Sequence, residues 1–205
     1  MPDFKYENEY RTKGFINICG VDEAGRGPLA GPVCAAAVIL DENNPIDGIN
    51  DSKKLTEKKR EELFPIIKEK AIAYSIAMAS VEEIEKYNIL EATYIAMVRA
   101  VEGLKIKADF AIIDGNRLPK GLKVPATTLI KGDALSSSIA AASVLAKVTR
   151  DRYMCSLPEK YDVYGFKKHK GYGTKEHIEA ILKFGESDLH RPSFLKKIYE
   201  RYGKA

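Results

Sequence analysis

"GVDEAGRGPLAGPV", residues Gly20–Val33, places two adjacent acids, Asp22 and Glu23, against a loop rich in glycine and proline. The segment before the acids, Phe15–Val21, is apolar, and Val33–Leu40 after the loop is apolar again. Short apolar runs bounded by turn residues are typical of buried strands. The stretch therefore predicts two sequential strands joined by a loop, with an acidic pair at the end of the first strand.

The remainder of the chain alternates between helical and strand patterns. Three more strands are predicted, over Ala71–Ser80, Ala108–Asn116 and Val124–Asp133. Helices are predicted over Leu55–Lys70 with Thr56 as its cap, Val81–Leu104, Ala134–Tyr153, Thr174–Phe184 and Pro192–Arg201. Three sequential strands followed by alternating helices and strands predict an α/β fold with a mixed sheet flanked by helices.

Composition limits the class of protein. The 205 residues are enough for one domain with a real core, and the net charge of +4 permits a polyanionic partner without requiring one. The cysteines, Cys19, Cys34 and Cys155, lack metal-binding spacing; Cys19 and Cys34 could meet across neighbouring strands, but core packing is the preferred interpretation. No apolar stretch reaches the ~18 residues of a membrane span, and the polar N-terminus is not a signal peptide. We therefore expect a cytoplasmic protein with no membrane partner.

Carboxylates recur at the ends of predicted strands. Asp22 and Glu23 close the first strand, Asp114 closes another, and Asp133 lies between a strand and a helix. Neighbouring side chains of a strand point to opposite faces, so Asp22 and Glu23 converge only if the strand bends or ends between them. Strand ends in open α/β sheets are common positions for sites. The alternative is that Asp133 is a helix cap and Asp114 a turn residue.

If these strand ends share one edge of the sheet, the acids crowd together. Crowded carboxylates have raised pKa values unless a cation neutralises them. All-oxygen ligands suit Mg²⁺ or Mn²⁺ and disfavour zinc. Two such ions ~3.5–4 Å apart activate water and stabilise the leaving oxygen in phosphodiester hydrolysis. The pattern therefore favours a two-metal phosphodiesterase site.

The predicted helix after Asp133 carries a polar stripe. At a helical period Asp133, Ser136, Ser143, Lys147 and Arg150 fall on one face. Hydroxyl and cationic groups running away from a metal ligand suit contacts with a phosphate backbone. The alternative is an ordinary solvated helix face.

Six motifs in fixed order carry a resemblance to a known family. The sequence resembles ribonuclease HII, a type 2 ribonuclease H, over nearly its whole length. A glycine-rich loop alone would not indicate this, and the loop lacks the GK[ST] of a P-loop. Besides the opening stretch, the motifs are "DSKKL" (Asp51–Leu55), "IIDGN" (Ile112–Asn116), "KGDALSSSIAAASVLAKVTRD" (Lys131–Asp151), "HKGYGTKEH" (His169–His177) and "HRPSF" (His190–Phe194).

The resemblance implies a ribonuclease H-like fold: a mixed five-stranded sheet flanked by helices, with a helical C-terminal extension. It implies a catalytic domain over residues 1–155 and the extension over 156–205, packed together as one functional unit. The related type 3 enzymes carry Glu in the fourth acidic position and an added N-terminal domain. Here Asp133 occupies that position and the first predicted strand begins at Phe15, which favours type 2.

The resemblance also implies an activity. Asp22, Glu23, Asp114 and Asp133 match the acidic quartet of the family, which implies catalysis with two Mg²⁺ or Mn²⁺ ions as cofactors. The implied reaction is endonucleolytic cleavage of the RNA strand in RNA–DNA hybrids and 5′ to single ribonucleotides embedded in duplex DNA. Its products carry 3′-hydroxyl and 5′-phosphate ends. The implied roles are ribonucleotide excision repair and RNA primer removal by a monomeric enzyme.

Two motifs match substrate-recognition elements of the family. Gly25, Arg26 and Gly27 match a glycine-arginine-glycine loop, in which glycines allow close approach and main-chain groups bond the 2′-hydroxyl that distinguishes RNA from DNA. Arg26 is a candidate phosphate contact, and its alternative is a loop-stabilising ion pair. Tyr172 matches the tyrosine that packs on sugar at a ribonucleotide–deoxyribonucleotide junction. The alternative for Tyr172 is ordinary packing.

Further substrate contacts are expected from four side chains: Lys53, Ser143, Lys147 and Arg150 are expected to hold the DNA backbone. His190 and Arg191 form either a structural or a phosphate-proximal pair, and the sequence leaves both open.

Two rival functions have distinct signatures. A DNA resolvase or another ribonuclease H-like nuclease would share the fold, but it would not need the glycine-arginine-glycine loop with Tyr172. A nucleic-acid-binding module without catalysis would gain nothing from acids facing phosphate. The intact acidic quartet therefore favours a nuclease.

Overall fold

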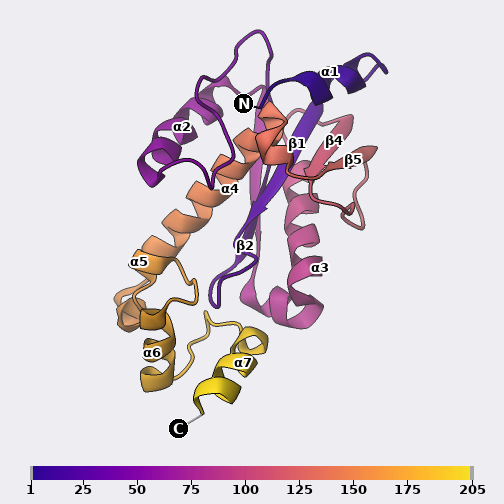
Figure 1. The fold of residues 1–205 in the computed structure, drawn as a ribbon. Coiled ribbons are helices and arrows are strands. Elements are labelled where there is room, and N and C mark those ends of the chain that lie inside the picture. The colour runs from indigo at the N-terminus through magenta and orange to yellow at the C-terminus, as the bar shows by residue number, and fades with distance from the viewer. Residues whose placement is uncertain (1, 204–205) are drawn as a thin grey trace.

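The computed structural model describes residues 2–203 and contains a five-stranded sheet with helices on both faces (Figure 1). Neighbouring strands follow the order β3-β2-β1-β4-β5; β1 and β2 pair antiparallel, as do β2 and β3, and β4 is parallel to both β1 and β5. This confirms the mixed five-stranded sheet. The strands are β1 (Ile18–Ala24), β2 (Val33–Ile39), β3 (Ala73–Ala79), β4 (Phe110–Asp114) and β5 (Ala126–Leu129).

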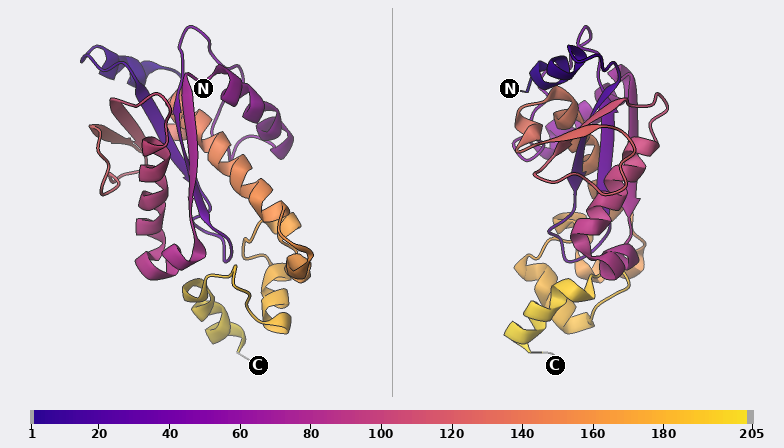
Figure 2. Two further views of the ribbon diagram at one scale, coloured as in Figure 1. Left: turned by 180° about the vertical axis from the view of Figure 1, so that it is seen from behind. Right: turned by 90° about the vertical axis from the view of Figure 1, so that its right-hand side faces the viewer.

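The helices cover the sheet from two sides and extend below it (Figure 2). Helices α2 and α4 pack on one face, and α3 packs on the other. The α-helices are α1 (Lys5–Arg11), α2 (Glu57–Lys70), α3 (Val81–Glu102), α4 (Ser137–Cys155), α5 (Phe166–His169), α6 (Lys175–Phe184) and α7 (Pro192–Tyr202); 3₁₀ turns are η1 (Gly132–Ala134) and η2 (Glu159–Tyr164).

Strand β2 shows how the two layers form. Alternate side chains of a strand point to opposite faces. Ala35 and Ala37 accordingly join the core beneath α3, while Ala36 and Val38 join the core beneath α2 and α4. A strand buried on both faces is a continuous apolar run, which explains why its position is evident from the sequence.

Strand β1 extends further than predicted. The apolar run ends at Val21, but pairing with β2 continues through Asp22 opposite Ala36 and Glu23 opposite Ala35. The predicted end of this strand at Val21 is therefore wrong, and the strand does not end between the two acids either, because β2 pairs with the main chain past the apolar run. Pairing with β4 ends earlier, at Val21. Asp22 thus lies where β1 and β4 part.

The start of α4 is set by a contact that the sequence does not predict. Helix α4 begins at Ser137 rather than Ala134, and the Ser136 hydroxyl caps it by accepting from the Ile139 amide. The buried carboxylate of Glu7 in α1 accepts hydrogen bonds from the Ser136 hydroxyl and the Ser138 amide. The N-terminal helix therefore holds the first turn of α4, and Asp133 lies in η1 just before it.

Of two other helix predictions, one is confirmed and one is corrected. Thr56 caps α2 as predicted, with its hydroxyl accepting from the Lys59 amide. The predicted continuous helix after Val81 is interrupted at Asn88, where φ is 69°. The Asn88 side chain accepts from the Leu90 amide and so restarts the helix.

The C-terminal segment after α4 packs against the loop between β1 and β2. Ala30 of that loop forms a cluster with Met154, Tyr164 and Phe166, and its main chain pairs with His190. The division into domains at residues 155 and 156 stays a prediction, but this contact places the C-terminal segment directly against the β1–β2 loop.

The cysteines and the membrane prediction have simple outcomes. Cys19 and Cys34 are both buried and free, and Cys34 lies opposite Ala24 in the sheet, so these cysteines pack in the core. Across the described residues, no helix has the length and apolar character needed to cross a membrane.

Close contact between β1 and α4 depends on Gly20. A side-chain carbon at Gly20 would overlap the Ile139 amide nitrogen and the main chain of Ser138. We predict that Gly20→Ala lowers the free energy of unfolding by about 2–3 kcal/mol, because main-chain atoms of a packed helix cannot move aside cheaply. Chemical denaturation measures this.

Gly27→Ala is the matched control. A side-chain carbon at Gly27 would meet no atom within 4 Å, so its expected effect on unfolding is within about 0.5 kcal/mol. Equal stability of the two variants would contradict the close approach of β1 and α4.

Candidate active site

Three aspartates from separate elements converge at the point where β1 and β4 part. Asp22 lies in β1, Asp114 ends β4, and Asp133 lies in η1. One carboxylate oxygen from each lies within 4.8 Å of the other two. Asp22 and Asp133 are each only 4% exposed. The fold thus brings together side chains from β1, the end of β4 and η1 that are far apart in the sequence.

Main-chain hydrogen bonds fix two of these carboxylates. Asp114 accepts a hydrogen bond from the Gly132 amide at 2.7 Å, which ties β4 to the turn that carries Asp133. Asp22 accepts one from the Glu23 amide, also at 2.7 Å. The aspartates are therefore held in place before any ligand binds.

The electrostatics of the cluster are unfavourable without a cation. Burial raises the pKa of Asp22 well above its usual value, and the neighbouring charges of Glu23 and Asp114 raise it further. Burial is also the main cause of the raised pKa of Asp114 and of Asp133, and at Asp133 the charge of Asp114 adds to it. Raised carboxylate pKa values mean that the folded protein resists ionisation of these groups.

The donor set suits a hard divalent cation. Closely spaced carboxylate oxygens are the ligands that Mg²⁺ and Mn²⁺ prefer, whereas structural zinc sites usually contain sulfur or nitrogen ligands. A bound cation would also remove the repulsion among Asp22, Asp114 and Asp133. The cluster therefore fits the predicted metal site on chemical grounds.

Glu23, the fourth predicted acid, lies beside the three aspartates but outside their group. Its carboxylate forms an ion pair of 3.3 Å with Arg26. Burial raises the pKa of Glu23, the Arg26 charge opposes that rise, and the charge of Asp114 adds to it. The ion pair proposed as the alternative for Arg26 is therefore present, although half of the Arg26 side chain remains exposed.

The "DSKKL" motif contributes two charged groups to the site. The ammonium nitrogen of Lys53 lies 3.7 Å from a carboxylate oxygen of Asp133. The charge of Asp51 is among the causes that raise the pKa values of Asp114 and Asp133, after burial. Asp51 was not among the predicted site residues, although the motif itself marked the segment.

A buried arginine shapes the glycine-arginine-glycine loop. Arg191 is fully buried and donates to the main-chain carbonyls of Gly25, Arg26 and Pro28 at 2.7 to 3.1 Å, and twice to that of Gly31. Every donor thus serves the loop, and none is free for a phosphate. Of the two roles left open for Arg191, the structural one is correct.

The position of Arg150 does not support the prediction that it holds DNA backbone. Arg150 is fully buried and donates to the carbonyls of Ala30, Pro32 and Lys170 at 3.0 Å each. It also packs against Gly25, where φ is +101° and a side chain would overlap the Arg150 guanidinium. Arg150 therefore supports the loop from beneath.

The predicted polar stripe on α4 faces the protein rather than solvent. Ser143 is buried, and its hydroxyl donates to the Ser52 hydroxyl at 2.6 Å. The Ser143 side chain also lies near Asp22 and partly opposes the rise in the pKa of that carboxyl group. The prediction that Ser143 touches DNA backbone is therefore not supported by its position. Only Lys147 is partly exposed, and it pairs with Asp151 at 2.8 Å.

Tyr172 lies on the surface beside the loop. Its side chain is 42% exposed, so it is not a core residue. The Lys147 ammonium and the Arg150 guanidinium lie 5.4 and 5.9 Å from the centre of its ring. The Gly171 carbonyl accepts from the Leu29 amide at 2.8 Å, which ties the Tyr172 segment to the loop.

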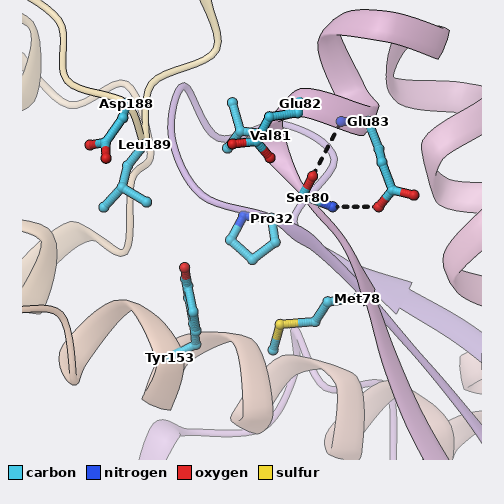
Figure 3. A pocket seen from close by; sticks show the side chains of 9 residues that line it. All are labelled: Pro32, Met78, Ser80, Val81, Glu82, Glu83, Tyr153, Asp188 and Leu189. Carbon is cyan, nitrogen blue, oxygen red and sulfur yellow. Dashed lines mark hydrogen bonds between the residues drawn. The ribbon is translucent and has the colours of Figure 1, made fainter.

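A separate cavity of about 310 Å³ lies between the start of α3, α4 and the C-terminal segment (Figure 3). Tyr153 and Pro32 face it, and its rim includes Glu82 and Asp188. The Ser80 hydroxyl and the Glu83 carboxylate cap α3 beside it. None of the three aspartates lines this cavity, so it is distinct from the acidic site.

Comparison with known proteins agrees with this geometry. A family model described as Ribonuclease HII matches residues 19–197. The chain belongs to the ribonuclease HII family. Ribonucleases H are hydrolases that cut RNA strands paired with DNA, so the predicted family, fold and enzyme class are confirmed.

Relatives match over most of their length. The chain is 54% identical over 195 residues to ribonuclease HII of Caldicellulosiruptor bescii, covering 95% of this chain and 94% of that protein. It is 59% identical over 177 residues to ribonuclease HII of Acinetobacter baylyi, covering 86% and 94%. The crystal structure of ribonuclease H2 from Pyrococcus horikoshii OT3 matches with a TM-score of 0.70 and 30% identity, covering 93% of this chain and all of that one.

The loop geometry of this ribonuclease makes Arg191 sensitive to change. We predict that Arg191→Lys lowers the free energy of unfolding by about 3 kcal/mol, because lysine cannot satisfy all the buried carbonyls that Arg191 serves. Cleavage of an RNA–DNA hybrid should fall as well, since the loop beside the aspartates loosens.

Denaturant unfolding and a cleavage assay on the same preparation measure both effects. Arg152→Lys is the control, since Arg152 is half exposed and pairs with Glu61 on the surface. A wild-type free energy of unfolding in the Arg191 variant would show that the carbonyl contacts contribute nothing.

Proposed function

We propose that this ribonuclease H cleaves the phosphodiester 5′ to a ribonucleotide, both in RNA–DNA hybrids and at single ribonucleotides embedded in duplex DNA. The products carry 3′-hydroxyl and 5′-phosphate ends. The observation that carries the proposal is the position of three crowded aspartates beside a loop in which Arg26 and Gly27 are exposed. The proposed catalytic site at the aspartates and the proposed ribose-recognition site in the loop are thus adjacent.

The acids would hold two Mg²⁺ or Mn²⁺ ions. Asp22, Asp114 and Asp133 supply closely spaced oxygens. Glu23 follows Asp22 in the chain, and one of its carboxylate oxygens pairs with Arg26. Bound ions of this class lower the pKa of an attacking water and stabilise charge on the leaving oxygen. No protein nucleophile is required, and Lys53 beside Asp133 is positioned to meet a phosphate.

The loop offers main-chain donors to a 2′-hydroxyl. Arg191 donates to the carbonyls of Gly25 and Arg26, so each of these carbonyls already has one hydrogen-bond partner. Among the described residues, no hydrogen bond uses the main-chain N–H groups of Arg26 and Gly27. Because a 2′-hydroxyl both donates and accepts, it separates RNA from DNA at such a position. We therefore assign ribose recognition to these amides.

Tyr172 would recognise the sugar beyond the ribonucleotide. Its exposed ring lies on the same loop-supporting segment, and the cationic groups of Lys147 and Arg150 lie against it. An aromatic face packs well on a deoxyribose, which lacks the polar hydroxyl. Lys53, Lys147 and Arg26 would supply the phosphate attraction that supports duplex binding.

The proposed activity suits two roles in the cell. Cutting beside single ribonucleotides initiates their excision from DNA, and cutting hybrids removes RNA primers during replication. We propose that the enzyme acts as a monomer in the cytoplasm, since one chain carries all the assigned acids and the loop.

The aspartate assignment predicts opposite effects on activity and stability. Asp114→Asn should reduce Mg²⁺-dependent cleavage by about a hundredfold or more, since several kcal/mol of transition-state stabilisation are lost. The pKa of Asp114 is raised in the folded state, so its ionisation destabilises the fold as pH increases. Without metal at pH 7 the variant should therefore be more stable than the wild type.

Cleavage assays with Mg²⁺, with Mn²⁺ and after exhaustive chelation, together with unfolding of the metal-free protein, test this assignment. Asp162→Asn is the control, because Asp162 pairs with Lys167 on the surface. Activity that survives chelation, or full activity in the Asp114 variant, would refute the metal site.

The tyrosine assignment predicts a substrate-specific loss. Tyr172→Ala should slow cleavage at a single ribonucleotide in duplex DNA by about tenfold or more, because the reacting phosphate is less well positioned. The comparison uses a duplex with one ribonucleotide, a long hybrid and an all-DNA duplex. Tyr87→Ala, which removes a ring of similar exposure, is the control.

An unchanged rate on the single ribonucleotide would exclude the junction role of Tyr172. Cleavage of the all-DNA duplex would instead favour a resolvase-like nuclease.

A further inference from the structure

The three histidines of the chain lie together in the C-terminal segment. His169, His177 and His190 are 8%, 0% and 1% exposed. The rings of His169 and His177 stack with centroids 4.4 Å apart, and Phe166 packs against all three. A polar cluster this deeply buried must satisfy each of its ring nitrogens.

The hydrogen bonds of two histidines determine where their protons lie. His190 Nδ1 accepts from the Ser187 amide at 2.9 Å, so the proton of neutral His190 is on Nε2. His190 Nε2 lies 3.1 Å from His177 Nε2 and must donate to it. His177 therefore carries its proton on Nδ1, which lies 2.9 Å from the main-chain carbonyl oxygen of Tyr172.

The third histidine completes the turn before Tyr172. His169 Nδ1 accepts from the Gly171 amide at 3.3 Å, and its Nε2 donates to the Tyr164 carbonyl at 2.7 Å. All six ring nitrogens of the cluster thus have a partner, and each partner is consistent with a neutral ring. None is left over to bind a metal.

We propose that His190 and His177 form a relay that fixes the main chain of Tyr172 and thereby positions its ring against the substrate sugar. The relay runs from the Ser187 amide through both imidazoles to the Tyr172 carbonyl. Both histidines are positioning residues, because neither ring is exposed to substrate. The inference rests on the proposed function of Tyr172.

The main chain of Tyr172 has other hydrogen bonds, but they come from its own turn. The Tyr172 amide donates to the His169 carbonyl, and the Tyr172 carbonyl also accepts from the Thr174 amide at 2.8 Å. The side chain itself touches cationic groups but makes no hydrogen bond among the described residues. The direction of the ring therefore depends on its main chain, which the relay holds from the buried side.

The relay requires both imidazoles to be neutral. A proton added to His177 would go on Nε2 and face the Nε2 donor of His190, and a proton added to His190 would go on Nδ1 and face the Ser187 amide donor. Burial lowers the pKa of His177 and of His190 to about 4, so both are neutral near pH 7. The ionisable groups that face the cluster are Asp188, Tyr164, Glu176 and Lys168.

Two substitutions at His177 separate the two ends of its ring. The amide nitrogen of Asn lies near the position of Nδ1, so His177→Asn keeps a donor to the Tyr172 carbonyl. The amide of Gln reaches toward Nε2, so His177→Gln keeps the contact with His190 and loses the Tyr172 contact. Each variant removes one hydrogen bond of the buried ring, which makes them matched in their expected cost to folding.

We expect His177→Gln to slow cleavage at a single ribonucleotide by about tenfold, relative to its rate on a long hybrid, because Tyr172 is displaced. His177→Asn keeps the contact with the Tyr172 carbonyl and loses only the support from His190, so it should slow cleavage at the single ribonucleotide less, by about threefold, and leave the rate on the long hybrid unchanged. A purely structural role would lower both rates equally in both variants. That outcome would overturn the relay.

Tyr172→Ala in the same assay separates failure of the relay from failure of the proposed function. If Tyr172→Ala cleaves the single ribonucleotide at the wild-type rate, the junction role is wrong, and the proposal that the histidines position Tyr172 for that role fails with it. If Tyr172→Ala is impaired while the Asn and Gln variants behave alike, the junction role stands and the relay is wrong.

Nitrogen-15 NMR of the wild-type histidines tests the relay without any variant. The expected signals at pH 7 are neutral rings with the proton on Nδ1 of His177 and on Nε2 of His190 and His169. A proton on Nε2 of His177, or a charged ring at that pH, would contradict the relay even if the variants fail to fold.

Discussion

Repulsion among buried carboxylates is the constraint on which the rest of the site depends. Asp22, Asp114 and Asp133 lie within 4.8 Å of one another, and burial raises the pKa of each. Such a cluster opposes folding until a cation binds, so the surrounding fold must hold the three carboxylates in place against their repulsion. The sheet does this by parting β1 from β4 after Val21 and by tying Asp114 to the Gly132 amide.

Buried cations without carboxylate partners support the neighbouring loop. Arg150 and Arg191 donate to main-chain carbonyls on both sides of the loop, and burial lowers the pKa of Arg191 to about 9. Carbonyl dipoles aimed at a guanidinium replace the water that it loses. The carbonyls of Gly25 and Arg26 each have a partner in Arg191, whereas no hydrogen bond among the described residues uses the amides of Arg26 and Gly27. The C-terminal segment, which carries Arg191, therefore supports the loop to which we assign ribose recognition.

Much of this organisation could be predicted from local pattern. Apolar runs located the strands because β2 is buried on both faces, and the acids stood out at their ends. The pattern failed where a partner decided the outcome. Asp22 and Glu23 lie within β1 because β2 continues to pair with them. Of the predicted stripe, Ser143 is buried against Ser52, and Arg150 is buried beneath the β1–β2 loop and the C-terminal segment.

The sequence by itself determined the fold class, the family and the identity of the acids, because apolar runs and short motifs are visible along the chain without knowledge of their partners. Only the tertiary structure decided which side chains face a ligand. Arg191 and His177 serve main-chain carbonyls, whereas Tyr172 is exposed, although all three lie in similar polar motifs. Hydrogen-bond partners of buried groups come from distant segments, so no local pattern records them.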